Sequence, residues 1–135
     1  MHLFKMYLAG QYFTPGSSAV LNYYGIGYDP VQYALNGEGH SKVRALVYNQ
    51  TTAAWENIGT NTYTIDNIGS NTALAKLTKT VTGLSDYLDA DNYIYIAAAA
   101  INSGSAFPND TEHSLRTYYV EVNNGSELAM HRGNA

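Results

Sequence analysis

The sequence has no cysteine and few charged residues, and each shortage excludes a class of protein. Without cysteine the chain has no disulfide, no thiolate metal ligand and no thiol nucleophile. Charged residues make up 13% of the 135 residues, and 7 Lys and Arg against 11 Asp and Glu give a net charge of −4. This mildly acidic composition argues against electrostatic capture of nucleic acid or of an anionic membrane.

Long hydrophobic runs are also missing. The longest apolar run, residues 93–101, is far shorter than the roughly 18–20 residues of a membrane-spanning helix. The opening MHLFKMYL contains no unbroken apolar stretch of the kind found in a secretory signal peptide. We therefore expect a protein that is made in a cytoplasm and has no membrane partner.

Aromatic residues are plentiful, at 13% of the chain, and 13 of the 17 rings are tyrosines. Disordered chains are poor in aromatics and rich in charge, so this composition predicts a folded protein. The length fits one ordinary domain.

Alternation of side chains with a period of two dominates the sequence. Val43, Ala45 and Val47 fall on one side of a run whose other side carries Leu46 and Tyr48. Turn signals rich in Gly, Asn and Pro recur roughly every 8–15 residues. This spacing predicts an all-β fold, an antiparallel β-sandwich of jelly-roll type with about eight strands. The expected strands are 4–13, 19–28, 42–49, 54–58, 62–68, 73–82, 93–101 and 115–122.

Three segments differ in character. Residues 1–37 hold six tyrosines and glycine-punctuated sequence, and they are either an N-terminal arm that lies on a neighbour or additional strands of the same sandwich. Residues 38–123 carry the clearest strand patterns and form the expected β-sandwich domain. Residues 124–135 are expected to form a polar C-terminal tail.

The central part of the chain resembles a family of small jelly-roll-like β-sandwich domains found in phage and prophage structural proteins. The resemblance lies in VRALVYNQTTAAWENIGT (residues 43–60), LSDYLDADNYIYI (84–96) and TYYVEV (117–122). It covers residues 40–122, about 60% of the chain. The resemblance implies a virion surface or assembly protein, or a sugar-binding module built on the same sandwich, and it transfers no individual functional residue.

The function expected first is that of a non-catalytic virion structural protein, decorating or cementing a capsid or forming part of a tail or fibre. Such a protein is expected to be a homo-oligomer and to bind capsid or tail proteins of the same virion through many weak contacts. Interface cores favour tyrosine and lack Lys and Glu. The residues expected to mediate attachment are Tyr7, Tyr12, Tyr23, Tyr24 and Tyr28.

The alanine run 97–100 bears on the same question, because small side chains let another surface approach a sheet closely. Two explanations stay open, namely tight packing within the sandwich and contact with an arm or a neighbouring subunit.

The alternative function is a carbohydrate-binding module for host-surface glycans. A hairpin whose loop is formed by residues 49–53 places Tyr48 and Trp55 opposite each other on two strands. We expect Trp55 to fill the core. The second interpretation is that Trp55 and Tyr48 form an exposed platform on which a sugar ring stacks.

No motif predicts catalysis or a cofactor. Asp86, Asp89 and Asp91 form the densest acidic patch, but their spacing lacks the glycine and the glutamate of an EF-hand loop. A solvated, capped turn is the expected role, with a calcium site as the alternative. The four histidines are widely spaced, and neither a nucleophile elbow nor a phosphate-binding loop is present. The protein is therefore expected not to be an enzyme.

Overall fold

The computed structural model describes residues 2–10, 13, 17–28, 40–60, 75–101, 114–125 and 128–132. These residues form eight strands and one 3-10 turn. The elements are β1 (His2–Tyr7), β2 (Ala19–Tyr28), β3 (His40–Asn49), β4 (Ala54–Thr60), β5 (Ala75–Val81), η3 (Leu84–Tyr87), β6 (Tyr93–Ile101), β7 (Ser114–Asn123) and β8 (Leu128–Arg132).

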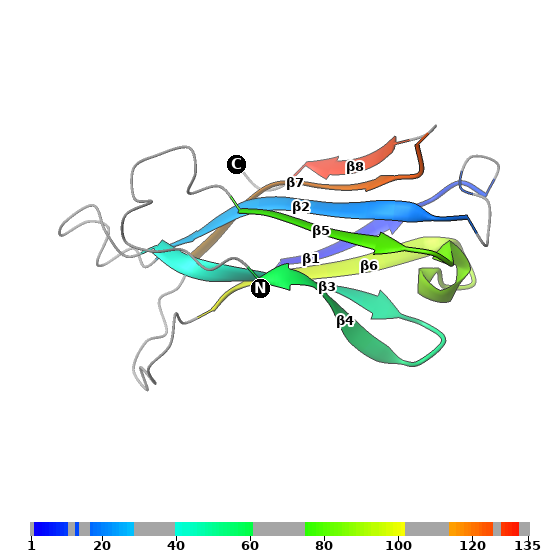
Figure 1. Ribbon diagram of the computed structural model, residues 1–135, viewed down its shortest axis with the longest axis horizontal. Helices are drawn as coiled ribbons and strands as arrows, with labels where there is room; N and C mark the ends of the chain where they lie inside the picture. The colour runs from blue at the N-terminus through cyan, green and yellow to red at the C-terminus, as the bar shows by residue number, and fades with distance from the viewer. Residues whose placement is uncertain are drawn as a thin grey trace.

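The strands form two antiparallel layers of four, as Figure 1 shows. Sheet A has the order β1-β6-β3-β4, and sheet B has the order β5-β2-β7-β8. The two layers are joined at one corner, where Gly27 and Tyr28 pair with Ser41 and His40. The predicted all-β antiparallel sandwich is confirmed. Among the described residues, no helix is long and apolar enough to cross a membrane.

The neighbours of each strand follow a jelly-roll pattern, in which strand n lies next to strand 9−n. β2 pairs with β7, and β3 pairs with β6. At one pair of edges β1 meets β8, where the rings of Phe4 and His131 are 5.1 Å apart. At the other pair of edges β4 meets β5, where Lys79 Nζ lies 3.8 Å from Glu56 Oε1. The chain thus winds as an antiparallel ribbon around one core.

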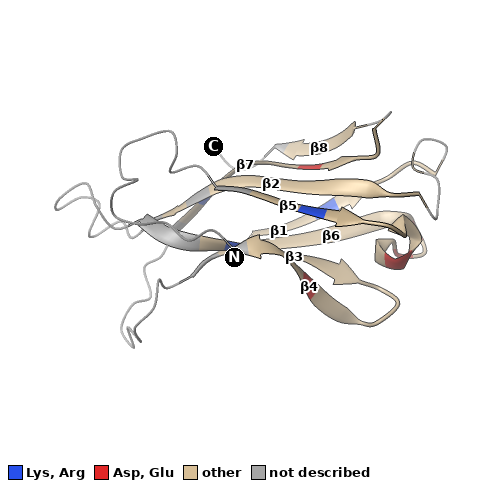
Figure 2. Cartoon of the chain, viewed as in Figure 1, with Lys and Arg blue, Asp and Glu red and all other residues tan. Residues whose placement is uncertain are grey.

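Alternation along each strand produces that core, because successive side chains point to opposite faces of a sheet. Sheet A contributes Val43, Val47 and Ile96 to the space between the layers, and sheet B contributes Leu21 and Val120, all with no exposed surface. The outward positions of the same strands are more mixed, with polar, aromatic and aliphatic side chains. Figure 2 shows how sparsely charged residues are distributed over the described strands.

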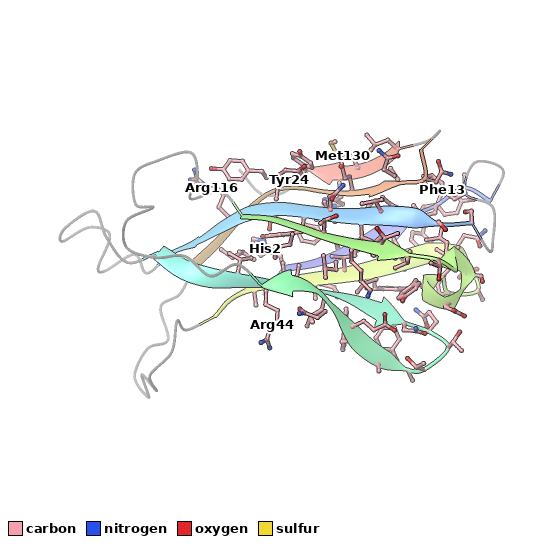
Figure 3. The ribbon with its side chains drawn as sticks, in the orientation of Figure 1. His2, Phe13, Tyr24, Arg44, Arg116 and Met130 are labelled. Carbon is pink, nitrogen blue, oxygen red and sulfur yellow. The ribbon has the colours of Figure 1, made fainter. Side chains whose placement is uncertain are left out.

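One buried polar chain connects the two sheets. Tyr23 Oη and Thr117 Oγ1 hydrogen-bond at 2.8 Å, and His2 Nδ1 lies 3.0 Å from the same Thr117 oxygen. Tyr23 and Thr117 have no exposed surface, and burial lowers the pKa of His2. Figure 3 shows His2 between the layers. Buried polar groups are tolerated when they pair in this way.

The N-terminal segment consists of sandwich strands in its described part. β1 is an edge strand of sheet A, whereas β2 lies inside sheet B and pairs with both β5 and β7. Residues 2–7 and 19–28 are therefore additional strands rather than an arm lying on a neighbour.

The expected C-terminal tail is also wrong in part. Leu128–Arg132 forms β8, which pairs with β7 from Asn123 to Tyr119. The expected strand 62–68 lies outside the described residues.

Candidate binding face

The outer side of sheet A carries a set of aromatic and aliphatic side chains that we call the aromatic face. The strand register places these side chains in rows, since Trp55 is opposite Tyr48, Lys5 is opposite Tyr95 and Tyr7 is opposite Tyr93. The members are Leu3, Lys5, Tyr7, Leu46, Tyr48, Trp55, Tyr93 and Tyr95. On β1, β3 and β6 the members alternate with core residues, and this alternation directs them outward, whereas Trp55 is placed by its position opposite Tyr48.

Six large apolar side chains are exposed among the described residues; three belong to the aromatic face, and the other three lie on β7 and β8. Leu3 is 61% exposed, Tyr7 is 57% exposed and Trp55 is 45% exposed. Single exposed apolar side chains are common on protein surfaces, but several on one sheet face indicate an interaction site.

A shallow hollow of about 250 Å³ lies in this face. It is lined by Leu3, Tyr48, Gln50, Trp55 and Tyr95. The rings of Tyr48 and Trp55 meet edge to face, with centroids 5.1 Å apart and planes at 68°. This geometry is favourable for two aromatic rings and holds the indole at a fixed angle. The walls of the hollow are therefore almost entirely apolar.

Next to the hollow, a charged network holds the tyrosines of β6. Tyr95 Oη donates to Asp89 Oδ2 at 2.6 Å, which raises the pKa of Tyr95 and lowers that of Asp89. Lys5 Nζ lies 4.3 Å from the centre of the Tyr93 ring, within cation–π range. The rings of Tyr7 and Tyr93 are 5.5 Å apart. The side chains of this part of the face are thus restrained by one another.

The loop between β3 and β4 is anchored to η3. The Asn49 side-chain oxygen accepts the backbone N–H groups of Thr51 and Thr52 at 2.9 and 3.0 Å. The Asp86 carbonyl accepts the N–H of Gln50 at 2.8 Å, and Thr51 Oγ1 donates to Asp86 Oδ1 at 2.9 Å. These bonds fix the loop that carries Gln50 and leads into Trp55. The face is therefore pre-organised before any ligand arrives.

Glu56 joins the same loop to η3 from the inner side of β4. Its carboxylate accepts Tyr87 Oη at 2.5 Å and Asn49 Nδ2 at 2.7 Å. The hydrogen bonds from Tyr87 and then Asn49 lower the pKa of Glu56. Burial and the Glu56 hydrogen bond raise the pKa of Tyr87 to about 12. Glu56 is thus held in its ionised form by neutral donors, with Lys79 beside it.

We expect Glu56→Gln to lower the free energy of unfolding near neutral pH by about 1–3 kcal/mol, because a charged acceptor of two hydrogen bonds is lost. The folded-state pKa of Glu56 lies below its ordinary value of 4.5. Its contribution is therefore fully present above that value and is lost as the pH falls through the folded-state pKa. Urea denaturation from about pH 7 to about pH 3 should show the gap between the two proteins closing in acid. A gap that stays constant with pH would contradict this role.

The tyrosines expected to mediate attachment do not lie together. Tyr7 is exposed on the aromatic face, and Tyr24 is half-buried on the outer side of sheet B, where it stacks on Tyr119 at 4.2 Å. Tyr23 is in the core with no exposed surface, so its expected role at a partner surface is wrong for this fold. Tyr12 lies outside the described residues, and so does the side chain of Tyr28.

Tyr48 and Trp55 are brought together as the hairpin prediction required, but Trp55 does not fill the core. β4 is an edge strand of sheet A, and Trp55 lies on its outer side, whereas Ile58 on the inner side is buried. The second interpretation, an exposed pair with Tyr48, matches this position. Leu3 and Tyr95 complete the hollow and were not expected there. The alternation of Tyr93 and Tyr95 against Ile94 and Ile96 is the signal that could have indicated Tyr95.

The carboxylates of Asp86 and Asp89 accept hydrogen bonds from the loops around them. Asp86 binds Thr51, and the Asp89 carboxylate accepts the N–H groups of Asp91 and Tyr93 at 2.9 Å each. In the part of the chain that the structure describes, no group of three His, Asp or Glu side chains is placed to hold a metal ion. Asp89 thus holds the turn that follows η3, as expected of a solvated turn, whereas no side chain caps the start of η3 itself. The calcium site stays an untested alternative. His113 and the side chain of His40 lie outside the described residues.

Two alanines of the 97–100 run, Ala97 and Ala98, are buried within the sandwich, whereas Ala99 is partly exposed. Ala98 faces the core and is 1% exposed. Ala97 belongs to the outer side of sheet A but is only 3% exposed, because the register places it between Leu3 and Leu46. The larger side chains on the two flanking strands cover this small one. Of the two explanations, tight packing within the chain accounts for both positions.

Comparison with known proteins adds no assignment, since the chain matches no protein-family model, no curated protein and no solved structure.

Proposed function

We propose that the chain is a non-catalytic structural protein of a virion, and that it attaches to other proteins of the particle through the aromatic face. The observation that carries the proposal is the exposure of Leu3, Tyr7 and Trp55 together on one side of a rigid sheet. The resemblance of residues 40–122 to phage structural domains supports the location, and the exposed face supports the mode of attachment.

The composition of the face suits a protein partner. Tyrosine, tryptophan and arginine are enriched in interface cores, whereas Lys, Asp and Glu are depleted. The hollow accepts an apolar side chain, because aromatic and aliphatic groups form its walls. Arg44 projects from the same outer side of sheet A, as Figure 3 shows, and supplies a polar rim. Many copies on one particle would convert modest single contacts into stable retention.

The test is incorporation into particles. We expect mass spectrometry to find the chain in virions purified from cells that produce it. The double variant Leu3→Ser, Trp55→Ser should be incorporated at least about tenfold less, because losing two side chains that the partner would bury costs more than about 1.4 kcal/mol. The control is Met130→Ser, which changes an exposed side chain on the outer side of sheet B. Absence of the chain from virions, or equal incorporation of the double variant, would refute the proposal.

Oligomeric state is a second readout, obtained by light scattering on the full chain. A truncation of residues 1–28 is unsuitable for this purpose, because it removes β1 and the interior strand β2. The double variant is the better comparison. A homo-oligomer that persists in the double variant would assign self-association to another surface.

A carbohydrate-binding module is the second candidate, favoured by the edge-to-face pair of Trp55 and Tyr48 at a hollow that Gln50 also lines. Aromatic rings stack on sugar rings, and an amide can bind their hydroxyls. Glycan-array binding by the full chain, lost in Trp55→Ala without loss of folding, would support this candidate. Absence of glycan binding at this hollow would exclude it.

A further inference from the structure

The outer side of sheet B, opposite the aromatic face, carries a second and chemically different hollow of about 370 Å³. Its lining includes Ser18, Val20, Asn22, Thr80, Asn123 and Asn124, and we call it the amide groove. Figure 3 shows Tyr24 and Met130 projecting from this side of the molecule. The two hollows therefore lie on the outer sides of different sheets, and one small ligand cannot contact both.

The strand register explains why polar side chains converge here. Val20 on the interior strand β2 is flanked by Thr80 on β5 and by Asn123 on β7. In the next outward row, Asn22 is flanked by Glu121 on β7 and by Thr78 on β5, and Thr78 lies outside the lining of the groove. Half-buried Val20 thus forms a small apolar floor, and hydroxyl and amide groups stand on both sides of it.

Asn22 is a nearly buried polar side chain in the lining of this groove. The side chain is only 9% exposed, and its Nδ2 donates to Glu121 Oε1 at 2.7 Å. Its Oδ1 has no hydrogen-bond partner among the residues that the structure describes. Leaving a nearly buried acceptor unpaired costs free energy, so a ligand that donates a hydrogen bond to it would recover that cost.

The charge of the groove limits the ligand class. Among the described side chains that line or border it, Glu121 alone is charged, and it accepts from Asn22. A carboxylate disfavours anionic ligands, while amides and hydroxyls offer both donors and acceptors. A neutral ligand with many hydroxyl groups meets these requirements.

We propose that the amide groove is a binding site for a neutral saccharide, distinct from the aromatic face. The ligand's hydroxyls would donate to Asn22 Oδ1 and exchange hydrogen bonds with Thr80 and Asn123, with a sugar C–H face over Val20. The inference goes beyond the proposed attachment function, since it gives the opposite side of the molecule a small-molecule ligand. An attached protein would then keep this side turned to solvent and to glycans.

The experiment is a titration of the ¹⁵N-labelled full chain with cellotetraose, maltotetraose and mannotetraose, each to about 10 mM, which covers weak affinities. We expect amide shifts to cluster at Val20, Asn22, Thr80 and Asn123 with at least one of the three. Shifts confined to Gln50 and Trp55 would overturn this proposal in favour of the second candidate function. Absence of groove shifts with all three sugars would also overturn it, without touching the incorporation test.

Matched variants locate the contact. Thr80→Val keeps the shape of the side chain and removes its hydroxyl, so the dissociation constant should rise about 3- to 10-fold. Thr78→Val makes the same change at the neighbouring exposed threonine of β5, which does not line the groove, and should leave affinity within about twofold. Thr80→Ser should restore binding. Equal effects of the two valine variants would contradict the site.

Discussion

Replacing Tyr23 with alanine is expected to lower the free energy of unfolding by about 3–5 kcal/mol, the usual cost of emptying a buried aromatic site. Tyr23 has no exposed surface, and its strand pairs on both sides, opposite Leu77 and Val120. Its hydroxyl also forms a hydrogen bond with the buried Thr117 hydroxyl. Chemical denaturation followed by circular dichroism measures the loss, which is a large fraction of the stability of an ordinary domain.

The control is Tyr7→Ala, made at a tyrosine that was equally expected to mediate attachment. Tyr7 is 57% exposed, so its removal should change stability by no more than about 0.5 kcal/mol. The loss in free energy of unfolding for Tyr23→Phe should lie between those of Tyr7→Ala and Tyr23→Ala, at about 1–3 kcal/mol. This variant keeps the ring but leaves the buried Thr117 hydroxyl with one partner fewer. A Tyr23→Ala protein as stable as Tyr7→Ala would contradict the placement of Tyr23 in the core.

Gly25→Ala is expected to destabilise the protein by about 1–3 kcal/mol through overpacking. A Cβ atom at Gly25 would overlap the Tyr23 hydroxyl and lie 2.6 Å from its Cζ and 2.7 Å from its Cε1. The ring cannot move aside easily, because it is buried and bonded to Thr117. Thermal and chemical denaturation of the variant measure the cost.

Gly83→Ala is the matched control. Its nearest neighbour would be Asp86 Oδ2 at 3.5 Å, and Gly83 has an ordinary extended φ of −133°. Its stability should therefore stay the same or rise by up to about 1 kcal/mol, since alanine restricts the unfolded chain. If Gly25→Ala and Gly83→Ala change the free energy of unfolding equally, the close contact of Tyr23 with Gly25 does not cause the destabilisation.

The strands were predictable because alternation is a local signal. Val43, Ala45 and Val47 all face the core, and Ile94 and Ile96 do so on β6, as their patterns indicated. The adjacent pair of Tyr48 and Trp55 followed from a short loop between two strands. These features depend on residues close in sequence, so no knowledge of the tertiary arrangement was needed.

The site could be predicted only in part, because it depends on which side of each strand faces the partner sheet. Adjacent Tyr23 and Tyr24 must point in opposite directions, so both could never belong to one contact surface. The exposure of Trp55 depends on β4 being an edge strand with Ile58 turned inward. β8 was missed because LAMHR has no clear alternation and pairs with a single neighbour. Leu3 reaches the hollow only through the pairing of β1 with the distant β6.

The interior position of β2 also bears on how the protein folds during synthesis. Its partner β7 lies about a hundred residues later in the chain, as the pairing of Val20 with Asn123 shows. Likewise β1 pairs with β6, far later in the chain, with His2 opposite Ala98. Folds dominated by such non-local pairing fold slowly, on the millisecond-to-second scale, because the chain must close long loops before contacts compensate. On the ribosome, β1 therefore stays unpaired until β6 has emerged, and one edge of β2 stays unpaired until β7 has emerged. The apolar sides of these strands are open to aggregation during that interval.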